Sequence, residues 1–336
     1  MAKRPTLTAA DRAVEYSPTT ARLFGFCQKK FYFTWLARRK QGWRKGLDHP
    51  WHRVYDLKQL KNRHTWAGDL YHEILAHILN DVCAGHEPDE DAARRLISDV
   101  AEAQFAFSAE HRFIGATKSH VEKYNGIPTF LALFEHAYGL PVDGLLEETR
   151  LNVDQWLMHT FSWEGWLPLI DHVQSARRVY IEPDNLLYLF AGARIRARMD
   201  VGVETRDGLF VLYDWKCYNE DKRFAAYDQH LFKQQLLAYA LWPVSREELR
   251  LAIDRVVAHV FNPVTGEERE IHFTENDCAD FEIDVDRWVR LQREMFTEVG
   301  DVVFDELRGP YDPQRSCPWC SFKAVCGEEI LWHELT

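Results

Sequence analysis

The strongest constraint in the sequence is a pair of segments with strand character between residues 195 and 214. Residues 195–203 and 209–214 are rich in β-branched and aromatic side chains, and Arg206-Asp207-Gly208 between them is typical of a turn. Such a pair predicts a β-hairpin, and the rest of the chain must pack around it.

The predicted hairpin carries two carboxylates and one ammonium group. Side chains two positions apart on a strand share a face, so Asp214 and Lys216 are expected to point the same way, and Asp200 lies on the partner strand. Hard divalent cations are held by carboxylate oxygens, while a lysine can orient water and offset phosphate charge. The trio therefore suits phosphodiester hydrolysis. Cross-strand ion pairs on a surface hairpin would use the same residue types and are the alternative.

Length and composition restrict the class of protein. At 336 residues the chain is long for one domain and short for three, which predicts one core domain with a large insertion. No run of 18 apolar residues occurs, so no segment is expected to span a membrane. The first residues lack the apolar stretch of a secretory signal, and seven scattered cysteines do not resemble a disulfide framework. We therefore expect a protein of the reducing cytoplasm.

Charge is distributed unevenly along the chain. The formal net charge of −11 argues against a protein that coats nucleic acid indiscriminately, because Lys and Arg dominate that kind of affinity. Basic residues nevertheless outnumber acidic ones between residues 22 and 63, and three arginines alternate before Asp200. We predict that a polyanion binds along these stretches; a solvated basic face is the alternative. The candidate contacts are Lys29, Lys30, Arg194, Arg196 and Arg198.

Several helices and strands are expected around the hairpin. A helix should begin at Ser17-Pro18 and run to about Arg39, because serine caps helices and proline suits their first position. The other expected elements are a loop over residues 40–65, a helix from about Ala67, mainly helical structure over 86–176 including 128–138, a strand over 178–181, a helix over 228–242, strands over 249–262 and 268–273, and a helix over 281–299.

Two of the expected helices carry polar residues of interest. His72 lies beside the apolar stripe of the helix that begins near Ala67. Gln235 and Tyr239 are four positions apart and share a helical face. A glutamine in an otherwise apolar stripe needs a partner, because an unpaired buried amide costs about 1–3 kcal/mol.

The C-terminal region contains a run of closely spaced cysteines, Cys317, Cys320 and Cys326. Three thiolates this close predict a metal centre in a reducing compartment. A fourth ligand is missing from the run. Cys27, His333 and a group from outside the chain are the candidates, and both iron and zinc accept thiolate ligands.

The order of these motifs resembles the PD-(D/E)XK nuclease superfamily, in which an Asp precedes a turn and the next strand carries (Asp or Glu)-x-Lys. The resemblance implies an α/β fold with a mixed central sheet flanked by helices. It implies catalytic roles for Asp200, Asp214 and Lys216, and a metal site for Mg²⁺ or Mn²⁺ that includes the backbone carbonyl of Trp215. Residues 68–72 match the Gly-x-x-x-His pattern of the RecB-like branch, which makes His72 a metal ligand.

Two further motifs are similar to those of RecB-like nucleases. Gln235 and Tyr239 match a Gln-x-x-x-Tyr motif that lies beside the active site. Nucleases that resemble AddB, and the iron–sulfur nucleases of CRISPR adaptation, carry one cysteine upstream and three downstream of the nuclease core. This resemblance implies a [4Fe–4S] cluster held by Cys27, Cys317, Cys320 and Cys326, with Zn²⁺ as the alternative metal.

Ligation by Cys27 would have a mechanical consequence. It closes a loop of about 290 residues, whose closure entropy is roughly 5 kcal/mol beyond a constant term. The cluster is therefore expected to be a structural clasp between the chain ends.

These patterns together imply a metal-dependent DNA nuclease that acts on single strands or DNA ends in DNA repair, recombination or defence. A helicase or an integrase-type protein is the expected partner. The alternative is a catalytically silent nucleic-acid-binding or scaffolding subunit. The predicted division is an N-terminal segment over 1–66, a nuclease core over 67–85 and 177–300, a helical insertion over 86–176 and a cysteine segment over 301–336.

Overall fold

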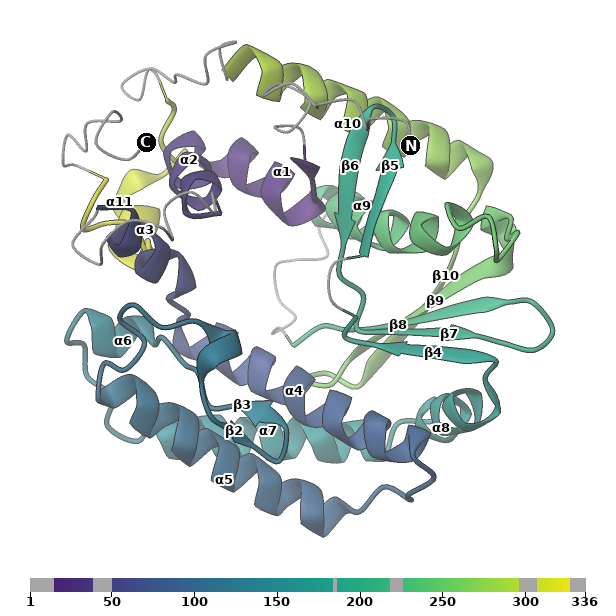
Figure 1. Ribbon diagram of the computed structural model, residues 1–336, viewed down its shortest axis with the longest axis horizontal. Helices are drawn as coiled ribbons and strands as arrows, with labels where there is room; N and C mark the ends of the chain where they lie inside the picture. The colour runs from purple at the N-terminus through teal and green to yellow at the C-terminus, as the bar shows by residue number, and fades with distance from the viewer. Residues whose placement is uncertain (1–14, 39–49, 184–185, 218–225, 296–306, 327–336) are drawn as a thin grey trace, which may run out of the picture. The chain divides into compact units, whose positions relative to one another are not determined.

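The computed structural model describes residues 15–38, 50–183, 186–217, 226–295 and 307–326 (Figure 1). The chain forms two compact units, each built from segments that are distant in sequence. The first unit contains residues 1–25 and 171–307, and the second contains residues 26–170 and 308–336. The domain boundaries expected from the sequence differ from those of the two compact units. They describe an expected division of function among segments, which stays a prediction.

The first unit is built on a five-stranded mixed sheet with strand order β10-β9-β8-β7-β4. Neighbouring strands are antiparallel except β8 and β9, which are parallel and are connected through α9 (Ala226–Val244). The expected mixed α/β fold is thereby confirmed. The strands are β4 (Arg178–Ile181), β7 (Val201–Glu204), β8 (Phe210–Trp215), β9 (Val256–Asn262) and β10 (Glu267–His272).

A smaller three-stranded sheet lies in the same unit. Its order is β1-β6-β5, formed by β1 (Glu15–Tyr16), β6 (Ala193–Ala197) and β5 (Leu186–Phe190). Helix α10 (Glu275–Met295) packs on β1 and β6. Tyr16 makes edge-on ring contacts with Phe281 and Trp288 of α10, at centroid distances of 5.5 Å and 6.2 Å. These buried rings join the N-terminal strand to the rest of the unit.

The hairpin expected from the sequence is shorter than predicted. Residues 195–203 do not form one strand, because β6 ends at Ala197 and β7 begins at Val201. The chain changes sheets between them, since β6 pairs with β5 whereas β7 pairs with β4 and β8. The hairpin itself is confirmed as β7–β8. The alternation that was expected to place Arg194, Arg196, Arg198 and Asp200 on one face is interrupted at this change of sheet.

The N-terminal helix is also divided. The expected helix from Ser17 to Arg39 is two helices, α1 (Pro18–Phe26) and α2 (Gln28–Ala37). Cys27 between them has an extended backbone (φ −156°, ψ 107°), and its sulfur caps α2 by accepting a hydrogen bond from the Lys30 amide at 3.4 Å. Gly25, Phe26 and Cys27 are poor helix formers, but no proline marks the break, so the sequence pattern did not predict it.

Helical structure replaces much of the loop predicted over residues 40–65. Helix α3 (Pro50–Gln59) lies in this range, and α4 (Arg63–Cys83) begins four residues earlier than predicted. Asn62 caps α4, because its Oδ1 accepts the Thr65 amide at 2.9 Å. The part of the predicted loop over residues 40–49 lies outside the described residues.

The second unit packs α4 against α5 (Glu90–Ala109) and α7 (Leu145–Phe161). Buried polar pairs specify the contacts: Tyr71 Oη lies 2.7 Å from Thr160 Oγ1, and Trp66 Nε1 donates to Gln104 Oε1 at 2.8 Å. The remaining elements are the hairpin β2 (Lys123–Tyr124) with β3 (Ile127–Pro128), the short α6 (Phe134–Ala137) and α8 (Trp166–Ser175), which crosses the boundary between the units.

The helix predicted over residues 128–138 is wrong for most of its length. Only Phe134–Ala137 is helical. The preceding residues are extended because their backbone pairs with Lys61: the Lys61 amide donates to the Ala132 carbonyl, and the Phe134 amide donates to the Lys61 carbonyl, each at 2.8 Å. Phe130 and Leu131 are buried in this extended segment.

The C-terminal segment over residues 308–326 belongs to the second unit. Phe322 is buried and stacks on Phe33 of α2 at a centroid distance of 5.4 Å. Tyr138 Oη donates to the Ser321 carbonyl at 2.8 Å, and the Gln28 amide donates to the Arg308 carbonyl at 2.9 Å. These contacts hold the C-terminal segment against α2 and against the residue that follows α6. Among the described residues, no helix has the length and apolar character needed to cross a membrane.

Candidate metal-binding active site

The end of β8 carries an ion pair between Asp214 and Lys216. Asp214 Oδ2 lies 2.5 Å from Lys216 Nζ, and the side chains are 1% and 17% exposed. The two side chains therefore point the same way, as their spacing on the strand predicts. Pairing with the ammonium lowers the cost of burying this carboxylate.

Asp200 faces the same strand end from the residue before β7. Its Oδ2 accepts a hydrogen bond from the Trp215 amide at 2.7 Å, and the residue is buried. Trp215 lies between Asp214 and Lys216 in the chain, so the bond fixes the Asp200 carboxylate beside the backbone that carries both side chains. The trio expected from the sequence thus comes together, although Asp200 lies at a change of sheet rather than inside a continuous strand.

Helix α9 brings Gln235 and Tyr239 to this ionic group. Gln235 Nε2 donates to Tyr239 Oη at 2.5 Å, which supplies the partner that the glutamine was expected to need. Burial and the charge of Asp214 raise the pKa of Tyr239 above its usual range. Burial also acts to lower the pKa of Lys216, but Asp214, Tyr239 and Asp200 outweigh it and raise that pKa. The mutual electrostatic influence identifies these side chains as one site.

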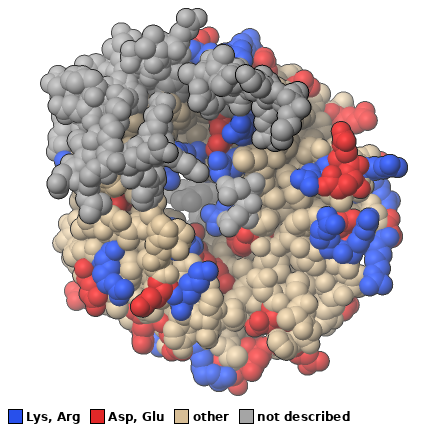
Figure 2. Space-filling model, viewed as in Figure 1, with Lys and Arg blue, Asp and Glu red and all other residues tan. Residues whose placement is uncertain are grey.

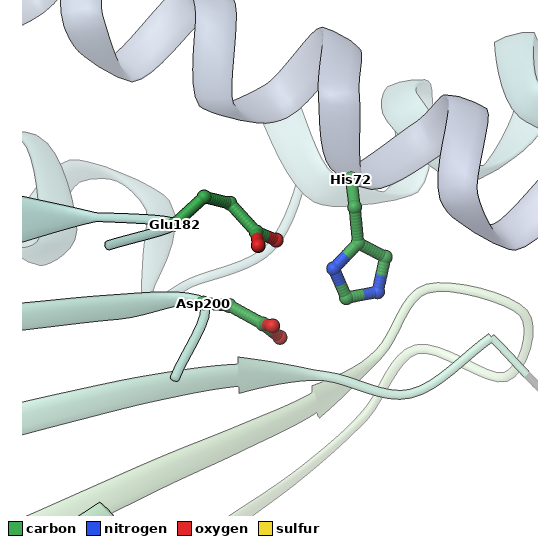
Figure 3. A group of neighbouring side chains, drawn as sticks. All are labelled: His72, Glu182 and Asp200. Carbon is green, nitrogen blue, oxygen red and sulfur yellow. The ribbon is translucent and has the colours of Figure 1, made fainter. Parts of the chain in front are cut away.

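Glu182 is a neighbour of Asp200 that is not among the site residues expected from the sequence. It follows β4, and its amide donates to the Asp200 carbonyl at 2.7 Å. Carboxylate oxygens of the two residues lie within 4.8 Å of each other. Figure 3 shows both side chains extending to the same side. Pairing of the strand over 178–181 with the one that begins at Val201 would have revealed Glu182, because that register sets it opposite Asp200.

The backbone of Glu182 is strained. Its φ of +39° falls in the left-handed region, which costs a residue with a Cβ about 1 kcal/mol or more. The Glu182 carboxylate contacts Arg198, whose Nη2 lies 3.3 Å from Oε2. Such strain is retained where the surroundings over-determine a conformation, and here the hydrogen bond to Asp200 does so.

His72 belongs to the second unit. It lies on α4, half-buried, and its ring contacts the Tyr71 ring edge-on at 5.9 Å. Figure 3 draws the imidazole projecting from this helix. Imidazole nitrogen is a common ligand of divalent metals.

The arginines of the smaller sheet differ in their surroundings. Arg196 Nε and Nη2 donate to the two Glu15 oxygens, at 2.6 Å and 2.9 Å. Arg198 contacts Glu182, whereas Arg194 is exposed on β6. On the face drawn in Figure 2, Lys and Arg side chains are interspersed with Asp and Glu side chains.

The cysteines Cys27, Cys317, Cys320 and Cys326 all lie in the second unit. Burial raises the pKa of Cys320 and of Cys326, and the charges of Cys27 and Cys317 raise both further. The four sulfurs are therefore electrostatic neighbours. Lys30 lowers the pKa of Cys320 and Lys29 lowers that of Cys326, so the two lysines lie beside the thiols.

Comparison with known proteins is independent of this geometry. A search of curated proteins gave no match. The crystal structure of SSO0001 is similar over 58% of this chain and 78% of that one, with 15% sequence identity and a TM-score of 0.29, a likeness too slight to carry an argument.

A family model described as the PD-(D/E)XK nuclease superfamily matches residues 15–327. The match contains the site from Glu182 to Tyr239 and the cysteine segment. The name of the superfamily describes acidic residues followed by a lysine, and Asp200, Asp214 and Lys216 are residues of these types. The chain belongs to the PD-(D/E)XK nuclease superfamily.

Proposed function

We propose that this protein is a deoxyribonuclease of the RecB-like branch that hydrolyses DNA phosphodiester bonds, on single strands or at ends, with Mg²⁺ or Mn²⁺. The observation that carries the proposal is the convergence of Asp200, Asp214 and Lys216 at the end of β8. A superfamily fold without this group would support nucleic-acid binding only.

The donor set fits a hard divalent cation. Asp200 and Asp214 are buried carboxylates in one unit, and Glu182 adds a third beside Asp200. Like charges this close repel one another, and a bound cation relieves that repulsion. We propose Asp200, Asp214 and the Trp215 carbonyl as ligands, with Glu182 as a further carboxylate and His72 as the ligand from α4. The cation would polarise the phosphate and lower the pKa of a bound water.

The remaining site residues have roles in positioning and charge. Lys216, held against Asp214, offsets negative charge on the scissile phosphate. Gln235 and Tyr239 form a hydrogen-bonded pair that fixes the α9 side of the site. Lys29, Lys30, Arg194 and Arg198 are the proposed contacts to the DNA backbone, and Arg196 stays a candidate although Glu15 holds its guanidinium.

We also propose that Cys27, Cys317, Cys320 and Cys326 hold a [4Fe–4S] cluster. The C-x2-C-x5-C spacing of the last three cysteines, with Cys27 upstream, is the observation that supports the cluster, and Zn²⁺ is the alternative metal.

Metal binding and cleavage test the proposed active site together. Asp200→Asn removes one charge but leaves an oxygen for the Trp215 amide, so the fold is expected to be retained. Titration of Mn²⁺ by calorimetry should show weakened binding, and cleavage of end-labelled single-stranded DNA should fall at least about a hundredfold. Glu182→Gln should weaken Mn²⁺ binding less than Asp200→Asn does.

The control for these variants is Asp207→Asn, which changes an exposed carboxylate at the turn of the same hairpin. It should bind Mn²⁺ and cleave DNA as the wild-type protein does. Near wild-type cleavage by the Asp200→Asn protein would refute the assignment of the site.

A further inference from the structure

The C-terminal segment of the second unit exposes two large aromatic side chains. Trp319 is 65% exposed and Tyr311 is fully exposed. Tryptophan is highly buried on average, so an indole left in solvent calls for an explanation. The segment over residues 308–326 also contains three basic residues and one acidic residue, in a protein with a net charge of −11.

The Trp319 indole and the Lys323 ammonium both contact the Phe134 ring. Lys323 Nζ donates to the Pro318 carbonyl at 3.1 Å and lies 3.9 Å from the centre of the Tyr138 ring. The same ammonium lies 4.7 Å from the centre of the Phe134 ring, against which Trp319 packs at a centroid distance of 6.2 Å. The indole and the ammonium are therefore held by the same small set of rings.

The segment that carries Trp319 is anchored directly after this residue. Phe322 is buried against Phe33, Tyr138 binds the Ser321 carbonyl, and Arg53 Nη2 donates to the Ala324 carbonyl at 3.3 Å. A side chain presented from an anchored segment loses little conformational freedom when it binds a ligand. The exposed Trp319 ring is thus preorganised.

We infer that Trp319 and Lys323, here called the Trp319 platform, bind single-stranded nucleic acid, with the indole stacking on its bases. Every base offers a π-face, so stacking tolerates sequence, and a neighbouring ammonium complements the phosphates. Unpaired bases are required, because a duplex hides their faces. The inference rests on the nuclease function proposed above and adds to it a contact with the strand outside the metal site.

Binding to two strands of equal charge tests the platform. The full chain is titrated in EDTA, so that no strand is cut, against a fluorescent oligothymidylate and against an abasic strand of the same length. Trp319→Leu should weaken binding to the thymidylate strand about fivefold to a hundredfold. It should change binding to the abasic strand little, because that strand has no bases to stack.

Trp319→Phe is the matched control, since it keeps a planar ring at the same position and should retain most of the affinity. Visible absorbance and thermal unfolding of each variant verify that the cysteine segment and the fold are intact. Equal weakening on both strands, or no weakening on either, would overturn the platform. Full binding by Trp319→Leu together with loss of a protein partner would assign the surface to protein docking instead.

Hydrolysis of a small phosphodiester with Mn²⁺ separates this inference from the proposed function. Bis(p-nitrophenyl) phosphate carries no nucleobase, so Trp319→Leu should hydrolyse it at the wild-type rate. If Trp319→Leu weakens binding as predicted but the wild-type protein hydrolyses neither DNA nor bis(p-nitrophenyl) phosphate, the platform is supported and the nuclease proposal is refuted.

Discussion

Asp56 is a carboxylate whose surroundings in the second unit favour its neutral form. Burial raises its pKa to about 6, even though the Gly115 amide and His52 act in the opposite direction. Both Asp56 oxygens accept from the Gly115 amide at 3.2 Å. An unfolded aspartate has a pKa of about 3.9, so the folded state binds this proton more tightly. The contribution of Asp56 to stability is therefore present at low pH and is lost as pH rises from about 4 to about 6.

Asp56→Asn should remove this pH dependence while retaining an oxygen for Gly115. The melting temperature of the variant relative to wild type should be higher at pH 7.5 than at pH 4.5, because only the wild-type protein must bury a charge at the higher pH. Differential scanning fluorimetry at the two pH values measures the difference, with the exposed Glu164→Gln as control. A relative melting temperature that is the same at both pH values would contradict the expectation.

At the scale of elements, the break between α1 and α2 has a chemical use. Cys27 occupies the break with its thiol buried, and α2 carries it next to the C-terminal segment through the stacking of Phe33 on Phe322. The break between two helices lets the Cys27 thiol point in a direction that it would not take within one continuous helix. The loop that such a ligand closes spans most of the chain, which is why ligation should contribute to stability.

Cys27→Ser should reduce the iron content and the broad visible absorption of anaerobically purified protein, because an oxygen ligand replaces a thiolate. Its melting temperature should fall as well. Cys83→Ser, at the end of α4 and exposed, is the control and should keep the wild-type spectrum. Stoichiometric zinc without iron in the wild-type protein would instead support the alternative metal.

At the scale of the whole molecule, the proposed binding of DNA works against a net charge of −11. The cations that contribute to this affinity are Lys and Arg side chains. A Lys or Arg side chain that is already paired with an acidic side chain contributes less. Arg196 is bound by both Glu15 oxygens and joins β1 to β6, whereas Arg194 is exposed on the same strand. The two arginines should therefore affect different properties of the protein.

Arg194→Gln should flatten the salt dependence of binding to single-stranded DNA by up to about 0.7 in log–log slope, as expected for one lost phosphate contact. Arg196→Gln should mainly lower the melting temperature, because it releases β1. Anisotropy titrations over a series of KCl concentrations measure the slopes. An unchanged slope in Arg194→Gln would exclude β6 from the DNA path.

The local patterns of the sequence determined much of this molecule. The hairpin before Lys216, the helix with Gln235 and Tyr239, and the strand over 267–272 follow from side-chain periodicity and turn residues, which act over a few positions. The strand expected over 249–262 is shorter than predicted, because it begins only at Val256. The same-face placement of Asp214 and Lys216 is likewise a property of one strand. Membership of the superfamily is consistent with these short-range signals.

Tertiary structure decided what periodicity cannot express. The change of sheet at Arg198–Asp200 depends on which strands β6 and β7 pair with, and the extended segment before Phe134 depends on pairing with Lys61. Glu182 joins Asp200 because β4 pairs with β7, although the two carboxylates are 18 positions apart. Hydrogen-bond partners from outside a segment can override the conformational preference of that segment, because pairing with them satisfies its backbone N–H and C=O groups. Strand pairing between residues distant in sequence therefore brought Glu182 to Asp200, a placement that the sequence patterns did not predict.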